Sequence, residues 1–297
     1  MAEQFLAHEA VTSRQAERYH SHYQMLKRSA DFIELCKNPQ LAAETALGPV
    51  HDFNFDAAIL FSDLLFPLEA MGMGLTYDPG PKLGFHLRAP ADLDRIRGGA
   101  ELAQQLQYQA DAVKLTRARL RADKGLIGFV GGPFTLYVYA AAGSHENAAE
   151  SLAGLTNGVY AGFNAKLLDL LAQTMAQQTH AGAEVIALFD TAAGEIDAAT
   201  YRTHVVPVLA DLLQRFRKLL VPYITGGLPG WTELLDPLAE AGADAIEIGI
   251  PFSDPVMDGG VIQEASRLAL EAGTRPADVL ATVAGSNPTG AVSFTEN

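Results

Sequence analysis

Apolar and polar residues alternate most clearly in residues 245–250, AIEIGI. A period of two is typical of a β-strand, so Ile246, Ile248 and Ile250 share one face and Glu247 lies on the other face between small neighbours. The isoleucine face requires helices against it, and we expect Glu247 to point into the interior of the sheet, largely buried and with a raised pKa. Since a buried, unpaired carboxylate tends to keep its proton, Glu247 is a candidate general acid/base. The alternative is a structural glutamate paired with Lys or Arg.

A similar pattern occurs sixty residues earlier. AGAEVIALFD at 181–190 and AGADAIEIGI at 241–250 both place a helix end before an acid and a strand. Further strands are predicted over 56–62, 126–131 and 220–225, with a weaker candidate at 291–294. Segments rich in Ala, Leu, Gln and Arg predict helices over 32–48, 101–122, 147–178 and 203–219. Alternating strands and helices indicate an α/β fold with a parallel sheet and right-handed crossovers.

Polar and glycine-rich residues follow the predicted strands. They are Ser62-Asp63, Gly131-Gly132-Pro133, Asp190-Thr191, Thr225-Gly226-Gly227 and Pro251-Phe252-Ser253-Asp254. The carboxyl ends of parallel strands are where α/β folds place their chemistry, so these residues locate a candidate site. For Asp63, Asp190 and Ser253 the alternative is a cap on the following helix.

Composition narrows the class of protein. A chain of 297 residues with 48% hydrophobic content can form one barrel or two smaller domains. No apolar run approaches the roughly 20 residues of a membrane span, and no signal segment opens the chain, so we expect a cytoplasmic protein without membrane contact. The lone Cys36 excludes an internal disulfide, and we expect no metal site. A net charge of −14 argues against nucleic acid as a partner.

An anionic substrate would need a local cluster of basic residues, and residues 13–23, SRQAERYHSHY, provide one. Arg14 and Arg18 are four residues apart, so on a helix they share a face and both reach one polycarboxylate. The alternative is a solvated basic helix end.

Several segments carry a resemblance to a known family. They are SRQAERY at 13–19, DFIELCKNPQLAAE at 31–44, DAAILFSDLLFPLEAMGMGL at 56–75, GPKLGF at 80–85, LIGFVGGPFTLYVY at 126–139 and AGAEVIALFDTAAGE at 181–195. Over about residues 10–219 the chain resembles uroporphyrinogen decarboxylase.

The resemblance implies decarboxylation, without a cofactor, of the acetate side chains of a tetrapyrrole polycarboxylate. Arg14 and Arg18 match residues that bind substrate carboxylates. Asp63 matches the carboxylate that accepts the pyrrole N–H groups and stabilises the protonated ring. Tyr139 and Thr191 match the family's tyrosine and the hydroxyl residue that follows a strand-end acid.

The chain also departs from this family. Glu17 replaces a glycine between the two arginines and Phe134 replaces a tryptophan, while the segment Asn-Leu-Gly-His-Gly with its substrate-binding histidine is absent. We therefore expect impaired decarboxylation.

Residues 221–280 resemble a second family, the tryptophan synthase α chain, through VPYITGGLPGW and the loop PFSDPVMDGG. The resemblance implies that Glu247 is the acid/base acting on indole-3-glycerol phosphate, that Asp258 holds the indole N–H and that Tyr223 lines the pocket. Gly260 and Leu228 depart from the pattern, and the phosphate-binding units are missing.

The sequence thus predicts a chimera of two TIM-barrel-like families. Residues 1–220 form a decarboxylase-like barrel segment, 221–283 complete the same barrel, and 284–297 form a tail. Fewer than eight strands are recognisable, so the barrel is expected to be incomplete or completed in a homo-oligomer. Three hypotheses remain: a porphyrin-pathway decarboxylase, a retro-aldol lyase of tryptophan biosynthesis, or an inactive recombined scaffold.

Overall fold

We analysed a computed structural model of the chain. It describes residues 21–77, 80–144, 147–216, 223–228, 230–236, 245–251, 260–285 and 291–296.

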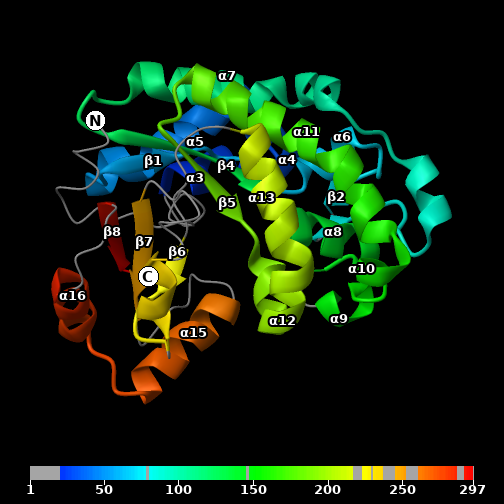
Figure 1. The fold of residues 1–297 in the computed structure, drawn as a ribbon. Coiled ribbons are helices and arrows are strands. Elements are labelled where there is room, and N and C mark those ends of the chain that lie inside the picture. Colours follow the sequence, from blue (N-terminus) through cyan, green and yellow to red (C-terminus); the bar gives the residue numbers. More distant parts are fainter. Residues whose placement is uncertain are drawn as a thin grey trace.

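The larger part of the molecule is organised around three parallel strands in the order β1-β4-β5 (Figure 1). They are β1 (Ala57–Ile59), β4 (Gly125–Gly131) and β5 (Val185–Phe189). Central β4 pairs with β1 from Ala57 opposite Gly125 and with β5 from Ile127 opposite Val185. These strands confirm the predictions at 56–62, 126–131 and 181–190, with β1 shorter than expected.

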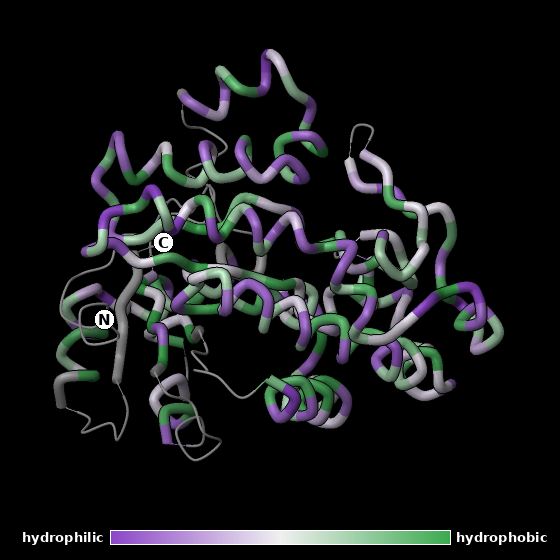
Figure 2. Tube along the Cα trace, turned by 90° about the horizontal axis from the view of Figure 1, so that it is seen from above, coloured by the Kyte–Doolittle hydropathy of each residue, from purple (hydrophilic) through white to green (hydrophobic). Residues whose placement is uncertain are grey.

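Helices cover this sheet and supply most of its core. The longest are α5 (Pro39–Phe53), α7 (Gln107–Arg119), α11 (Val159–Ala181) and α13 (Val206–Arg215). Helix α7 packs against both α5 and α11, and α11 also packs against β4, β5 and α13. Hydrophobic and hydrophilic positions alternate along these helices, as Figure 2 shows from above, because each has one buried face.

Shorter elements connect the long helices. They are α3 (Ser21–Leu26), α4 (Phe32–Lys37), α6 (Phe66–Ala70), the hairpin β2 (Thr76–Tyr77) and β3 (Pro81–Lys82), η1 (Pro90–Arg95), η2 (Ala100–Leu106), α8 (Pro133–Ala142), α9 (Ala148–Ser151), α10 (Gly154–Asn157), η4 (Thr191–Glu195), α12 (Ala198–Thr200), η5 (Tyr201–Val205) and η6 (Trp231–Leu234).

A chain of buried polar side chains joins α7 and α11 to the sheet. The Gln109 amide donates to Ser62 Oγ at 2.9 Å. The Gln178 amide donates to the Phe129 carbonyl at 2.9 Å and to Gln109 Oε1 at 3.3 Å. A Cβ at Gly128 would lie 2.3 Å from Gln178 Oε1, so glycine in β4 makes room for the amide.

The C-terminal part contains a second sheet of three parallel strands, in the order β6-β7-β8. They are β6 (Tyr223–Thr225), β7 (Ala245–Ile250) and β8 (Ala291–Glu296), and they are flanked by α15 (Gly260–Glu271) and α16 (Pro276–Gly285) (Figure 1). The weaker candidate at 291–294 is therefore confirmed as a strand.

The second sheet has its own hydrophobic core. Ile246 and Ile248 of β7 pack in one cluster with Val279 and Val283 of α16, and Leu235 completes it. The expected isoleucine face with a helix against it is thus confirmed.

The two sheets meet through helices. Helix α15 packs against β6 and also against η4, the segment that follows β5. Within the described ranges no ladder joins β5 to β6, and the strands do not close into a ring. The architecture is TIM-barrel-like α/β, as expected, and the division of the chain at residue 220 stays a prediction.

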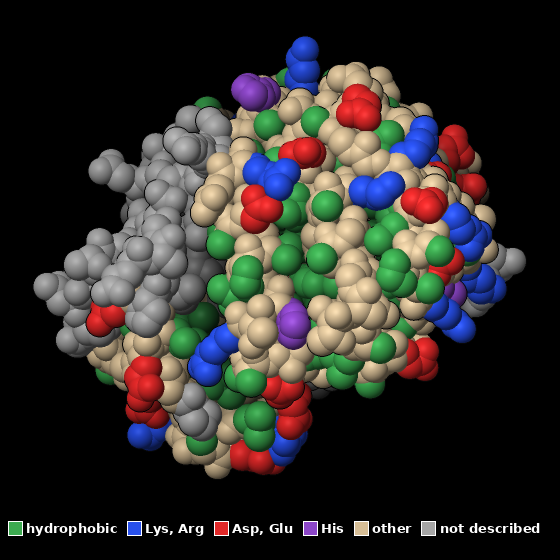
Figure 3. Space-filling view, turned by 45° about the vertical axis from the view of Figure 1, so that its right-hand side comes forward, with side chains coloured by type: hydrophobic (Ala, Val, Ile, Leu, Met, Phe, Trp, Pro, Cys, Tyr) green, Lys and Arg blue, Asp and Glu red, His purple; other side chains and the backbone are tan. Residues whose placement is uncertain are grey.

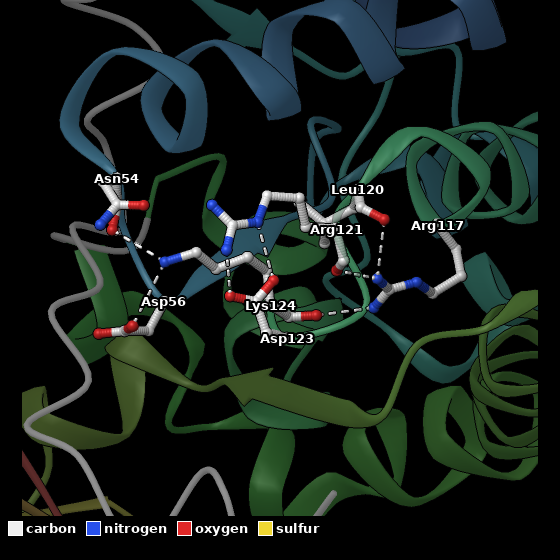
Figure 4. Close-up of polar contacts among 7 residues, drawn as sticks. All are labelled: Asn54, Asp56, Arg117, Leu120, Arg121, Asp123 and Lys124. Carbon is white, nitrogen blue, oxygen red and sulfur yellow. Dashed lines mark hydrogen bonds and ion pairs between the residues drawn. The ribbon is translucent and has the colours of Figure 1, made fainter.

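A polar turn at the amino end of β4 ties α7 to the sheet (Figure 4). The Arg117 guanidinium donates to three backbone carbonyls, those of Lys124 at 2.8 Å, Leu120 at 3.2 Å and Arg121 at 2.7 Å. Lys124, only 6% exposed, donates to the Asn54 carbonyl at 3.1 Å and lies 3.5 Å from Asp56 Oδ1. These contacts lie at the end of the sheet opposite to the polar strand ends, where residues serve stability.

Basic and acidic side chains lie beside one another on the face shown in Figure 3, rather than in separate patches. Arg215 pairs with Asp169 and Asp211. Among the described helices, none has the length and apolar content to cross a membrane.

Candidate active site

The carboxyl ends of β1, β4 and β5 meet at the pair Gly131-Gly132. A Cβ on Gly131 would lie 3.0 Å from the Leu64 carbonyl oxygen, next to Asp63 in the loop after β1. A Cβ on Gly132 would lie 2.3 Å from Asp190 Cβ at the end of β5. Two glycines therefore allow both acid-bearing loops to approach the end of the central strand.

Asp63 is half-buried in the loop after β1. Its Oδ1 accepts a hydrogen bond from the Leu65 N–H at 2.8 Å, which closes a turn just before α6. Asp63 therefore has the local capping role that was the alternative to a site residue. This hydrogen bond uses one of its two carboxylate oxygens.

Two half-buried tyrosines, each with a buried hydroxyl oxygen, lie near the Asp63 carboxylate. The pKa of Tyr77 is raised, first by burial of the phenol and then by the negative charge of Asp63. Its hydroxyl lies beside Asp63 but makes no hydrogen bond of good geometry. Burial also raises the pKa of Tyr108, with smaller contributions from the charges of Glu69 and Asp63. Both phenols therefore stay neutral next to the carboxylate.

Asp190, at the end of β5, reaches the first turn of α8. Its Oδ1 accepts the Thr135 N–H at 2.7 Å, while Oδ2 is buried and makes no hydrogen bond of good geometry to any described residue. The pKa of Asp190 is raised because desolvation outweighs the hydrogen-bonding effect of Thr135 and of the Phe134 backbone. The alternative prediction for Asp190 was a cap on the helix that follows it. Asp190 does cap a helix, but that helix is α8, which precedes it in the sequence.

Thr191 and Tyr139 lie on the two elements that Asp190 connects. Thr191 is the first residue of η4 and is half-buried. Tyr139 lies in the second turn of α8, half-buried against the main hydrophobic core. Asp63, Tyr139 and Thr191 thus lie on the three segments that follow the carboxyl ends of β1, β4 and β5, respectively.

The other predicted site residues are placed differently. Arg14, Arg18 and Asp258 lie outside the described residues. Tyr223 pairs directly with Glu247 in the β6–β7 ladder, so their Cα atoms are cross-strand neighbours in the second sheet.

The expectation that Glu247 is largely buried is met in part, because its side chain is half-buried and not fully enclosed. The isoleucines of β7 occupy the face covered by α16, and Glu247 faces the opposite side of the sheet. Within the described residues this sheet has only three strands and does not curl into a closed interior, so desolvation is incomplete.

Two residues of the site were not singled out from the sequence. Thr135 makes a long-range hydrogen bond with Ala192, and Tyr77 lies beside Asp63. The local signal for Thr135 was its spacing of four residues before Tyr139. Among the described residues, no cluster of three or more His, Cys, Asp or Glu side chains could hold a metal ion.

Comparison with known proteins agrees with this architecture. The family model described as uroporphyrinogen decarboxylase matches residues 9–267. The uroporphyrinogen decarboxylase of Pelobacter propionicus is 36% identical over 236 residues, which cover 78% of this chain and 69% of the relative. That of Anaeromyxobacter sp. is 34% identical over 249 residues, covering 79% and 70%.

A solved structure supports the fold alone. A methyltransferase from Methanosarcina mazei superposes with a TM-score of 0.59 at 19% identity, covering 88% of this chain and 79% of that chain. The sequence matches carry the assignment further: this chain belongs to the uroporphyrinogen decarboxylase family.

Proposed function

We propose that the protein binds a tetrapyrrole polycarboxylate at the carboxyl ends of β1, β4 and β5 and removes CO₂ from its acetate side chains, at a reduced rate. The observation that carries the proposal is the meeting of three strand ends at Gly131-Gly132, with Asp63 on one side and Asp190-Thr191 on the other. Family membership supports the choice of uroporphyrinogen as substrate.

In this proposal Asp63 acts electrostatically. Protonation of a pyrrole ring carbon creates a cation, and a fixed carboxylate that accepts the pyrrole N–H stabilises it. The bond between the acetate methylene and its carboxylate then breaks, CO₂ leaves, and the electron pair neutralises the ring cation. A second proton converts the methylene to a methyl group, and the ring loses the first proton. Arg14 and Arg18 would hold the remaining carboxylates.

The test is CO₂ release from uroporphyrinogen by the wild type and by Asp63→Asn. The amide keeps an acceptor for the Leu65 N–H and removes the charge, so the fold should persist while turnover falls about 100-fold. Asp94→Asn, an exposed change on η1, is the matched control and should turn over like the wild type. Equal rates for the wild type and Asp63→Asn would contradict the proposed role, and an inactive wild type would contradict the function.

A second candidate function is the cleavage of indole-3-glycerol phosphate by the segment that resembles the tryptophan synthase α chain. It is favoured by the pairing of Tyr223 with Glu247, which puts two of its proposed residues side by side. The decarboxylase family match, however, continues to residue 267, past the predicted join at 219–222. Indole release, assayed in parallel with CO₂ release, distinguishes the two lyases. The inactive scaffold predicts neither product.

A further inference from the structure

Asp190 and Thr135 form a reciprocal hydrogen-bonded pair between two elements that are far apart in sequence. Asp190 Oδ1 accepts the Thr135 N–H of α8 at 2.7 Å. Thr135 Oγ1 in turn accepts the Ala192 N–H of η4 at 3.0 Å. Each side chain thus satisfies an N–H in the first turn of the other residue's segment, as in a capping box divided between two elements.

The start of α8 requires this partner. The residue at the ordinary capping position is Gly132, which has no side chain to accept a hydrogen bond. Asp190, which directly follows β5, supplies the missing acceptor. It can come this close because Gly132 has no Cβ, and a Cβ there would collide with it. The Gly132 N–H also donates to the Phe189 carbonyl at 2.7 Å, which holds the two backbones together.

We propose that Asp190 and Thr135 are positioning residues that fix Tyr139 and Thr191 relative to each other, an inference that rests on the proposed function. Tyr139 follows Thr135 by four residues in α8, so the two share a helix face. Thr191 follows Asp190 directly, and its neighbour Ala192 donates to Thr135. A single hydrogen-bonded joint therefore sets the position of both proposed substrate contacts.

The pair is poorly suited to stability alone. Thr135 is 1% exposed, and one carboxylate oxygen of Asp190 is out of contact with water and has no hydrogen-bond partner among the described residues. A buried oxygen left unsatisfied in this way is destabilising, because its interactions with water are lost and not replaced. The placement is consistent with selection for the geometry of the joint.

The experiment compares deleting and conservative variants in steady-state CO₂ release from uroporphyrinogen. Asp190→Ala removes the acceptor for the Thr135 N–H and Thr135→Val removes the acceptor for the Ala192 N–H, whereas Asp190→Asn and Thr135→Ser keep an acceptor at each position. We expect the deleting variants to lower kcat roughly tenfold or more with little change in KM, because misplacement affects the reacting geometry. The conservative variants should stay within about threefold of the wild type, and the double deletion should be no worse than either single deletion.

Thr174→Val is the matched control. Thr174 is as buried as Thr135, but its hydroxyl donates to the Leu170 carbonyl of its own helix. This variant should lose stability without losing kcat. If Asp190→Ala does not fold, Thr135→Val carries the test, since it removes one hydroxyl and keeps the shape of the side chain.

The outcomes separate the two proposals. If Asp63→Asn is inactive while Asp190→Ala and Thr135→Val behave like Thr174→Val, the positioning role is overturned and the function stands. If kcat and KM change as much in the conservative variants as in the deleting ones, the positioning role is also overturned. If the wild type releases no CO₂, the proposed function and the positioning role fail together.

Discussion

Asp190 shows at the scale of one residue how a carboxylate can be both held and destabilised. Two features act on its pKa in opposite directions, because burial disfavours the charged form while hydrogen bonding by Thr135 and the Phe134 backbone favours it. Burial prevails, so the pKa of Asp190 is higher in the folded protein than in the unfolded chain.

This direction predicts a pH dependence. An unfolded aspartate titrates near a pKa of about 3.9. Between that value and the raised folded pKa, the unfolded state binds fewer protons, so the free energy of unfolding falls as pH rises, by at most about 1.4 kcal/mol per pH unit. The advantage of Asp190→Asn over the wild type should therefore grow from pH 4.5 towards neutral pH, as measured by denaturant unfolding.

Asp92→Asn is the control with the opposite sign. Backbone hydrogen bonds from Arg88 and Ala89 lower the pKa of Asp92, so its ionised form stabilises the fold above the unfolded pKa and this contribution is lost as pH falls. Relative to the wild type, Asp92→Asn should lose stability as pH rises. A pH-independent difference for Asp190→Asn would mean that water reaches its carboxylate.

At the scale of elements, the turn between α7 and β4 depends on the few charged groups shown in Figure 4. Arg117 binds three carbonyls near the end of α7, where a cation is also favoured by the helix dipole. Arg121, in the same turn, pairs with Asp123, and both side chains are more than half exposed.

The two arginines should therefore differ in their effect on stability. Arg117→Ala leaves three carbonyls with one partner fewer and should lower the free energy of unfolding by roughly 2–3 kcal/mol. Arg121→Ala removes an exposed ion pair and should change it by less than about 1 kcal/mol. Thermal and denaturant unfolding of both variants provide the measurement. Equal losses would show that the carbonyl contacts of Arg117 contribute no more than a surface pair.

At the scale of the whole molecule, two small sheets replace one closed barrel in the described residues. Each has three strands, so β1, β5, β6 and β8 each have a single neighbour there. An open edge of a parallel sheet presents unpaired N–H and C=O groups, which favours pairing with another chain.

We therefore predict self-association. In sedimentation velocity, the weight-average sedimentation coefficient should increase with protein concentration. Hydrogen exchange of the edge strands should be slower at high protein concentration, while that of central β4 should not change. A matched comparison within one sample is β7, the centre of the second sheet. A compact monomer with strong protection throughout residues 223–285 would rule out this prediction.

The amino-acid sequence determined the local structure because its signals act over a few residues. Alternation in residues 245–250 placed three isoleucines on one face, and β7 has that face against α16. Apolar runs at 126–131 and 185–189 became paired parallel strands, and the polar residues after them marked the edge where the candidate site lies. These features depend on backbone geometry and on the burial of nearby apolar side chains.

Only the tertiary structure decided which distant residues meet. Asp190 caps a helix that begins 57 positions earlier at Pro133, with Thr135 as its partner, and the space for this contact comes from Gly132. The exposure of Glu247 depended on how many strands surround it, which its own alternating segment does not encode. Burial and hydrogen bonding of a polar group depend on every element packed around it, so they follow from the assembled fold and not from the local pattern.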